Sequence, residues 1–179
     1  MRIVGGKYRG KKLVSPASQN VRPTSDKARE AIFNILRSKL GNDFRGLKLV
    51  DVFSGSGAFG LEAVSQGFAK VCLVDIDTND LMKNVKLFPL DKDKISVVKA
   101  DIMKGLNFSE KFDVVFSDAP YNKGLSEKAL NELVPFLNNG AICFVEIEKN
   151  EYLNLPQQFK LVDERKYGIA KIVIAEFIC

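Results

Sequence analysis

Hydrophobic and polar positions along the chain fall into blocks that predict strands and helices in alternation. From residue 46 onward, short runs rich in Val, Ile and Leu are typical of buried strands, and the segments between them are long enough for helices. The expected strands are residues 47–52, 71–74, 95–98, 114–116 and 141–145. The expected helices are residues 58–66, 78–88 and 126–137. This succession predicts an α/β, Rossmann-like fold with a mostly parallel sheet and helices on both faces.

The two ends of the chain break this alternation. Residues 159–167 and 170–178 are β-rich runs joined through Gly168, and they predict an antiparallel hairpin at the edge of the sheet. The N-terminal segment contains two short apolar pairs around a Gly-rich turn, which predicts a small β-hairpin. A helix should follow over residues 24–40, where Ala, Ile and Leu recur at helical spacing.

The composition fits a single globular domain. The chain has 179 residues, of which 46% are hydrophobic and 27% charged, and one core of ordinary size can form at this length. We expect one domain over residues 1–179, with an N-terminal extension at 1–40 and a Rossmann-like core at 46–179. No apolar run approaches the roughly 20 residues of a membrane span, and the first residues lack the pattern of a signal peptide. These features predict a cytoplasmic protein that does not bind membranes.

Cysteine and histidine usage excludes several kinds of site. The three cysteines are Cys72, Cys143 and Cys179, no two of which are close in sequence, so neither a disulfide framework nor a zinc site is expected. The chain has no histidine, which excludes Ser-His and Cys-His nucleophile pairs and any metal site built on imidazole. We therefore expect no metal, and a reducing compartment suits the free thiols.

The positive charge is concentrated near the N-terminus. The chain carries a formal net charge of +5, and residues 1–30 hold eight Lys and Arg against two acidic residues, so the remainder is close to neutral. Such a basic segment is typical of a protein that binds nucleic acid, and a solvated polar arm is the alternative. The residues in or beside the Gly-rich turn that can reach phosphates are Arg9, Lys11, Lys12 and Arg22.

A Gly-rich segment, DVFSGSGAFG at residues 51–60, includes the end of the first expected strand of the core and the residues after it. Glycines let the chain turn sharply and let a ligand approach the backbone closely. Gly55, Gly57 and Gly60 match the dinucleotide fingerprint, and Asp75 lies 20 residues beyond Gly55, as a ribose-binding acid should. An NAD-dependent dehydrogenase is therefore one interpretation, although histidine is absent and no acid–base residue is evident.

Three aspartates at successive strand ends favour S-adenosylmethionine instead. Asp51, at the mouth of the loop, would repel a pyrophosphate but attract the ammonium and sulfonium groups of this cofactor, which has no phosphate. Asp75 would hold the ribose hydroxyls, and Asp101 would accept a hydrogen bond from the adenine amino group. The carboxyl ends of parallel strands meet where open α/β sheets bind ligands. The predicted cofactor-binding residues are Asp51, Phe53, Ser54, Gly55, Gly57, Asp75, Ile76, Asp101 and Ile102.

The segment after the fourth expected strand has the residue types needed to methylate an amino nitrogen of a base. Asp118, Ala119, Pro120 and Tyr121 resemble the [D/N/S]-P-P-[Y/F/W] motif of amino-methyltransferases, with Ala119 in place of the first proline. The lone pair of an exocyclic amine is delocalised into the ring, so acceptors for both N–H bonds favour its localisation as the methyl group arrives. The Asp118 carboxylate and the Ala119 carbonyl are the predicted acceptors. Tyr121 offers a face on which an extruded base can stack.

The chain resembles a known family over nearly its whole length. RIVGGKYRG at residues 2–10 and RPTSDKARE at residues 22–30 are the specific part, and the glycine loop, residues 118–121 and ERKYG at residues 164–168 complete the match. These segments are similar to the bacterial 16S rRNA guanine-N2 methyltransferases of the RsmD type. The resemblance implies a seven-stranded class I methyltransferase sheet, S-adenosylmethionine as cofactor, and a guanine of 16S rRNA in an assembling small ribosomal subunit as substrate. It also implies that the extension helps to hold RNA, and we expect a monomer.

Two other functions stay open at this point. Adenine-N6 methylation of DNA or RNA uses a similar four-residue motif, but it normally needs a target-recognition domain, for which 179 residues leave little room. The other is a non-catalytic RNA-binding protein with a degenerate cofactor site. Intact Asp118, Pro120 and Tyr121 argue against that interpretation.

Overall fold

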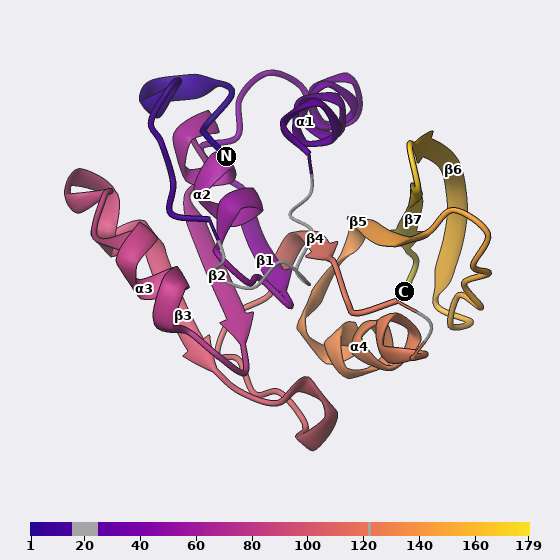
Figure 1. The fold of residues 1–179 in the computed structure, drawn as a ribbon. Helices are drawn as coiled ribbons and strands as arrows, with labels where there is room; N and C mark the ends of the chain where they lie inside the picture. Colours follow the sequence, from indigo (N-terminus) through magenta and orange to yellow (C-terminus); the bar gives the residue numbers. More distant parts are fainter. Residues whose placement is uncertain (16–24, 122) are drawn as a thin grey trace.

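A seven-stranded sheet organises the computed structural model, which describes residues 1–15, 25–121 and 123–179 (Figure 1). Along the sheet the strands follow the order β3-β2-β1-β4-β5-β7-β6. The strands are β1 (Lys48–Val52), β2 (Lys70–Asp75), β3 (Ile95–Lys99), β4 (Phe112–Ser117), β5 (Leu137–Glu148), β6 (Phe159–Tyr167) and β7 (Ala170–Phe177). The helices are α1 (Asp26–Leu40), α2 (Ala58–Gln66), α3 (Asn79–Val85) and α4 (Leu125–Leu133), with short 3-10 helices η1 (Gly6–Tyr8), η2 (Pro89–Lys94), η3 (Ile102–Lys104) and η4 (Val134–Phe136).

The directions of the strands confirm the predicted α/β fold with an antiparallel C-terminal hairpin. Strands β1 to β5 run parallel to one another, whereas β7 is antiparallel to both of its neighbours, β5 and β6. The strand order reverses between β1 and β4. Open α/β sheets bind ligands beyond the carboxyl ends of their strands at such a reversal, so the topology places the candidate site where β1 and β4 end.

Successive side chains along the strands point to opposite faces of the sheet and belong to two apolar cores, one on each face. In β1, Leu49 belongs to the core that α1, α2 and α3 cover, whereas Val50 belongs to the core that α4 covers. Phe59 of α2 joins the helices to the sheet, because its ring stacks on Phe116 of β4 and on Phe33 of α1, with centroid distances of 3.8 and 5.3 Å. The position of α2, and of the loop that precedes it, is therefore fixed from both sides.

Local signals account for most helix ends. The helix predicted at residues 58–66 coincides with α2, and α1 begins after Ser25, whose hydroxyl accepts the Ala28 N–H at 3.1 Å. Helices α3 and α4 are shorter than predicted. The chain continues into 3-10 helices that contain Pro89 and Pro135 in their first turns, and proline removes a backbone donor. Within the part of the chain that the structure describes, no helix is long and apolar enough to cross a membrane.

The N-terminal hairpin is tighter than the sequence pattern suggests. Arg2 and Lys12 form a single antiparallel bridge, and the 3-10 helix η1 replaces an open turn between them. The main-chain N–H groups of Val4 and Gly5 donate to the carboxylate of Glu62 in α2, both at 2.8 Å. Because these donors are bound to another element, they do not extend the strand pairing. The segment lies beside α2, where Figure 1 draws it in indigo.

Candidate active site

Four aspartates reach the carboxyl edge of the parallel strands. They are Asp51 in β1, Asp75 at the end of β2, Asp101 after β3 and Asp118 after β4. The strand register aligns them, because Val52 is paired with Val74 on one side and with Ser117 on the other. Asp75 and Asp118 therefore each lie one residue beyond the level of Val52, on either side of the glycine loop. The structure brings together the acids that the sequence predicted at successive strand ends.

The glycine loop between β1 and α2 is held by main-chain hydrogen bonds at several points. The Gly55 N–H donates to Asp75 Oδ2 at 2.7 Å, and the Ser54 N–H donates to the Val74 carbonyl at 3.0 Å. Phe53 has a φ of 60°, a left-handed conformation that is costly for a bulky residue. The loop is thus a fixed feature whose strain is balanced by these contacts.

The glycines of the loop have two different physical roles. A Cβ on Gly57 or Gly60 would overlap side chains of Leu81 or Leu73, so packing requires glycine at both positions. A Cβ on Gly55 would meet no atom within 4 Å. Gly55 therefore borders open space, with a φ of 54° that favours glycine. This is the position at which a ligand can approach the backbone of the loop.

Asp51 is buried under the loop, with 1% of its surface exposed. Its Oδ2 accepts the Gly60 N–H at 3.0 Å, and its Oδ1 has no hydrogen-bond partner among the described residues. Burial raises the pKa of this carboxyl to about 8, the charge of Asp75 adds to the rise, and the Gly60 N–H opposes it. A buried acid with an unpaired oxygen would be stabilised by a nearby positive charge, which fits the ammonium and sulfonium groups of S-adenosylmethionine.

The next two strand ends supply polar and apolar groups for a nucleoside. Both carboxylate oxygens of Asp75 accept main-chain N–H groups, from Gly55 and Asp77, and this fixes the orientation of the side chain. The adjacent Ile76 is 66% exposed, an unusual position for a large apolar side chain and a suitable surface for an adenine ring. Asp101 Oδ1 accepts the Met103 N–H at the start of η3, whereas Ile102 is buried in the core.

The Asp118–Tyr121 segment leaves the sheet directly after β4. Ala119 is buried, Pro120 is exposed, and Asp118 is half-buried at the strand end. The Tyr121 hydroxyl donates to Glu146 Oε1 at 3.1 Å. The segment therefore has its acidic residue at the end of β4, next to the strand that leads into the glycine loop, and its aromatic residue in contact with β5.

Glu146 is a candidate site residue that the sequence did not predict. It lies in β5, is only 5% exposed, and contacts Tyr121. The available signal was a carboxylate within the apolar run AICFVEI at residues 141–147. A charged residue is rarely buried in a strand unless a polar group pairs with it, but only the fold shows that Tyr121 is such a group.

The predicted RNA-binding cations have different surroundings. Arg9 and Lys12 are exposed. Lys11 is already engaged, because its Nζ donates to the Leu87 carbonyl at 2.8 Å and lies over the rings of Tyr8 and Phe88. Arg22 lies outside the described residues. Among the described residues, no group of three or more acidic or cysteine side chains is arranged to hold a metal ion.

Comparison with known proteins identifies the family. A family model described as "Conserved hypothetical protein 95" matches residues 1–176. The chain belongs to this family. It is 33% identical over 177 residues to ribosomal RNA small subunit methyltransferase D of Haemophilus influenzae, covering 94% of this chain and 90% of that protein. It is 35% identical over 175 residues to the protein of the same name from Escherichia coli, covering 94% and 85%.

A solved structure agrees with the sequence relatives. The putative methyltransferase yhhF from Escherichia coli superposes with a TM-score of 0.83 at 31% identity, covering 100% of this chain and 98% of that chain. The predicted RsmD-type family and class I methyltransferase fold are thereby confirmed, and the protein is an S-adenosylmethionine-dependent methyltransferase. The comparisons favour neither a dehydrogenase nor a non-catalytic protein.

Proposed function

We propose that this methyltransferase transfers a methyl group from S-adenosylmethionine to the exocyclic N2 amine of a guanine in 16S rRNA. The observation that carries the proposal is the pairing of β1 with β4, which sets the start of the Asp118–Tyr121 segment next to the start of the glycine loop. Two relatives that are at least 33% identical over 94% of this chain are named for methylation of small-subunit ribosomal RNA.

The chain's own residues account for the chemistry in this proposal. Bound S-adenosylmethionine supplies an electrophilic methyl group on a sulfonium. Asp118 and the Ala119 carbonyl accept the two N–H bonds of the guanine amine, which orients its lone pair and stabilises the positive charge that develops on nitrogen. Tyr121 stacks on the extruded base, and Glu146 holds the Tyr121 hydroxyl. Positioning of this kind can carry an in-line transfer without a covalent intermediate.

The cofactor-binding groups in this proposal are those at the first three strand ends. Asp75 binds the ribose, Asp101 the adenine amine and Ile76 the adenine face, whereas the buried Asp51 balances the positive charge of the cofactor. The loop residues Phe53, Ser54, Gly55 and Gly57 surround the methionine part, and Ile102 supports Asp101 from the core.

We further propose that the substrate is a structured RNA in an assembling small subunit in the cytoplasm, and that the enzyme acts as a monomer. Residues 1–40 serve as an RNA-holding extension of a single domain whose core is residues 46–179. Arg9 and Lys12 are exposed cations of the described part of the extension that can reach phosphates. Lys11 adds positive charge to the same segment, and Arg22, which lies outside the described residues, adds positive charge to the extension by its sequence.

Incubation of the purified protein with tritiated S-adenosylmethionine and small-subunit particles from a deletion strain tests this function. Label in 16S rRNA, mapped to the N2 atom of one guanine, is the expected result. Asp118→Ala should lower kcat at least about a hundredfold, since a group that orients the reacting amine acts in the chemical step. Its affinity for the cofactor should change less than about twofold.

The exposed Asp93 provides the matched control, and Asp93→Ala should retain wild-type kcat. Label on adenine N6, or label in DNA with none in rRNA, would contradict the proposed guanine-N2 substrate and show that the enzyme methylates a different base or nucleic acid. Wild-type turnover by Asp118→Ala would remove Asp118 from the mechanism.

A further inference from the structure

A fully buried asparagine joins the N-terminal extension to the glycine loop. Asn84 lies in α3 with 0% of its surface exposed. Its Nδ2 donates to two main-chain carbonyls, Val14 of the extension at 3.0 Å and Ser56 of the glycine loop at 2.9 Å. Its Oδ1 accepts the Val14 N–H at 2.7 Å. One side chain thus satisfies three main-chain groups that belong to two segments far apart in sequence.

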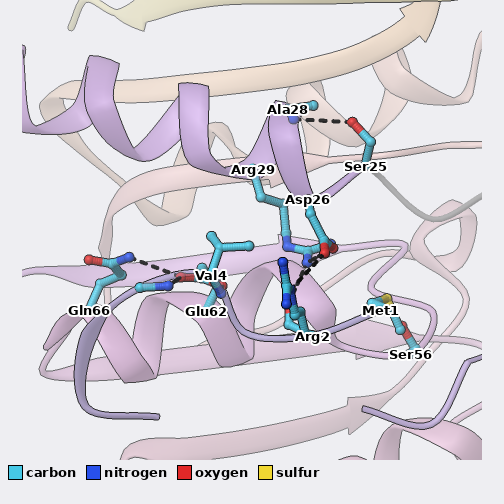
Figure 2. A network of polar contacts seen from close by, with 11 residues as sticks. Met1, Arg2, Val4, Ser25, Asp26, Ala28, Arg29, Ser56, Glu62 and Gln66 are labelled. Carbon is cyan, nitrogen blue, oxygen red and sulfur yellow. Dashed lines mark hydrogen bonds and ion pairs between the residues drawn. The ribbon is translucent and has the colours of Figure 1, made fainter. Parts of the chain in front are cut away.

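The loop side of this connection is close to the predicted cofactor position. Ser56 lies between Gly55, which borders open space, and Gly57, which packs against Leu81 of α3. The Ser56 hydroxyl also contacts Met1 Sδ at 3.7 Å, as Figure 2 shows. The Ser56–Gly57 peptide is therefore oriented by Asn84 of α3, and the Ser56 side chain contacts the first residue of the extension.

The extension is fixed to the other side of the loop through α2, which begins directly after Gly57. Glu62 of α2, which is 0% exposed, accepts the Val4 and Gly5 N–H groups. Figure 2 shows Val4 beside Glu62 and Gln66. Both helices that flank the glycine loop therefore hold the extension by buried polar side chains.

The first residues of the extension are also fixed to the start of its own helix, α1. The Arg29 guanidinium, which is buried, donates to the Arg2 carbonyl at 2.7 Å and to Asp26 at 2.6 Å (Figure 2). A segment held at its two ends and in its middle moves only together with the elements that hold it. Any ligand that orders one of these elements also stabilises the segment.

We propose that Asn84 is a positioning residue that couples the extension to the cofactor site. S-adenosylmethionine bound at the glycine loop restricts the motion of the Ser56 main chain. Because Asn84 is hydrogen-bonded to Ser56 and to Val14, the motion of Val14 is restricted as well. Coupling of this kind is reciprocal: the factor by which bound cofactor favours the ordered extension equals the factor by which an ordered extension raises the affinity for the cofactor. The inference rests on the proposed function only in placing the cofactor at the glycine loop. It gives the extension a role in cofactor binding that is separate from the charges that face RNA.

Calorimetry of S-adenosylmethionine binding to the full chain, without RNA, gives the first test. Asn84→Ala removes the donor to Ser56 and leaves that carbonyl buried without a partner, so Kd should rise about tenfold. Asn131→Ala is the matched control. Asn131 is an exposed helical asparagine that also donates to a main-chain carbonyl, Glu127, at 3.0 Å, and its substitution should leave Kd unchanged.

Amide hydrogen exchange of the unsubstituted protein gives a second test that does not depend on the folding of a variant. Saturating S-adenosylhomocysteine should slow exchange in residues 3–14 about fivefold or more. In folded Asn84→Ala this slowing should be lost at residues 13–14, which Asn84 holds, while protection around Asp75 and at the Val4 and Gly5 N–H groups bound to Glu62 remains. Exchange in residues 3–14 that is insensitive to the ligand, or unchanged Kd in folded Asn84→Ala, would overturn the inference. Absence of cofactor binding by the unsubstituted protein would instead contradict the proposed function.

Discussion

At the scale of single residues, the site places ionisable groups where burial controls their charge. Asp51 is the clearest case, because one of its oxygens binds the Gly60 N–H and the other has no partner among the described residues. Burial raises the pKa of its carboxyl to about 8, which favours the protonated form at neutral pH in the protein without ligand. A cationic ligand nearby would favour the ionised form, so the site can neutralise the cofactor's charge without keeping a bare carboxylate in the apolar interior.

Replacement of Asp51 by asparagine tests this description through the pH dependence of stability. The folded protein retains a proton that the unfolded chain releases near the ordinary pKa of 3.8. The contribution of Asp51 to stability is therefore fully present below pH 4 and is lost as pH rises toward 8. The amide of Asp51→Asn does not titrate. The melting temperature of the variant minus that of the wild type should therefore increase by several degrees as pH rises from about 5 to 8.

Melting curves of both proteins at half-unit pH intervals, without cofactor, give the measurement. The difference in melting temperature between the two proteins should stop increasing above about pH 9. Parallel curves over the whole range would show that the pKa of Asp51 is not raised in the folded protein.

Tyr121 gives a second prediction at this scale. Tyr121→Ala removes the ring and should raise KM for the rRNA particle roughly tenfold or more, because base stacking is worth about 1–3 kcal/mol. Tyr121→Phe keeps the ring and loses only the hydroxyl that donates to Glu146, so its KM should rise much less. Equal KM values for Tyr121→Ala and the wild type would rule out stacking.

At the scale of elements, the basic extension combines anchoring and exposed cations. Lys7 and Lys11 are bound to Asp91 and to the Leu87 carbonyl, whereas Arg9 and Lys12 are exposed. Only cations that can leave the protein surface for phosphates contribute fully to counterion release. The extension should therefore bind RNA through fewer charges than its composition suggests.

The double substitution Arg9→Ala and Lys12→Ala should flatten the dependence of log affinity on log salt. Each lost phosphate contact changes this slope by about 0.7–0.9, so a loss of roughly 1.5 is expected, with cofactor affinity unchanged. The matched control is Lys111→Ala with Lys160→Ala, two exposed lysines outside the extension, which should keep the wild-type slope. If Arg9→Ala with Lys12→Ala leaves the slope and the RNA affinity unaltered, the extension has only a structural role.

Elements with strong local signals could be predicted, and those set by distant partners could not. The span of α2 follows from its apolar spacing and flanking glycines, and the sequence-based range matches it. The hairpin at residues 1–14 differs because Glu62, more than 50 residues away in sequence, accepts two of its N–H groups. The same reasoning applies to Glu146, since the partner that makes its burial acceptable is on another element.

At the scale of the whole molecule, the strand order brings the predicted residues to one edge. The alternation of strands and helices predicts parallel βαβ units, and the Gly-rich loop predicts where the first unit binds a ligand. It does not predict how the extension is seated, because Asn84 and Arg29 look like ordinary helix residues in the sequence. Their role depends on main-chain carbonyls that only the folded chain brings within reach.

The place of β7 in the sheet has a consequence for biosynthesis. This strand follows the others in the chain, yet it lies between β5 and β6 and is the sole partner of β6 in the described sheet. During translation β6 emerges from the ribosome first and has no neighbour with which to pair. One side of β5, whose residues Ala141–Ile147 are all buried in the finished protein, stays open for the same interval. The sheet can close only after Phe177 has been made, so the nascent chain passes through a stage with two unpaired strand edges, the condition under which chains are most prone to aggregate.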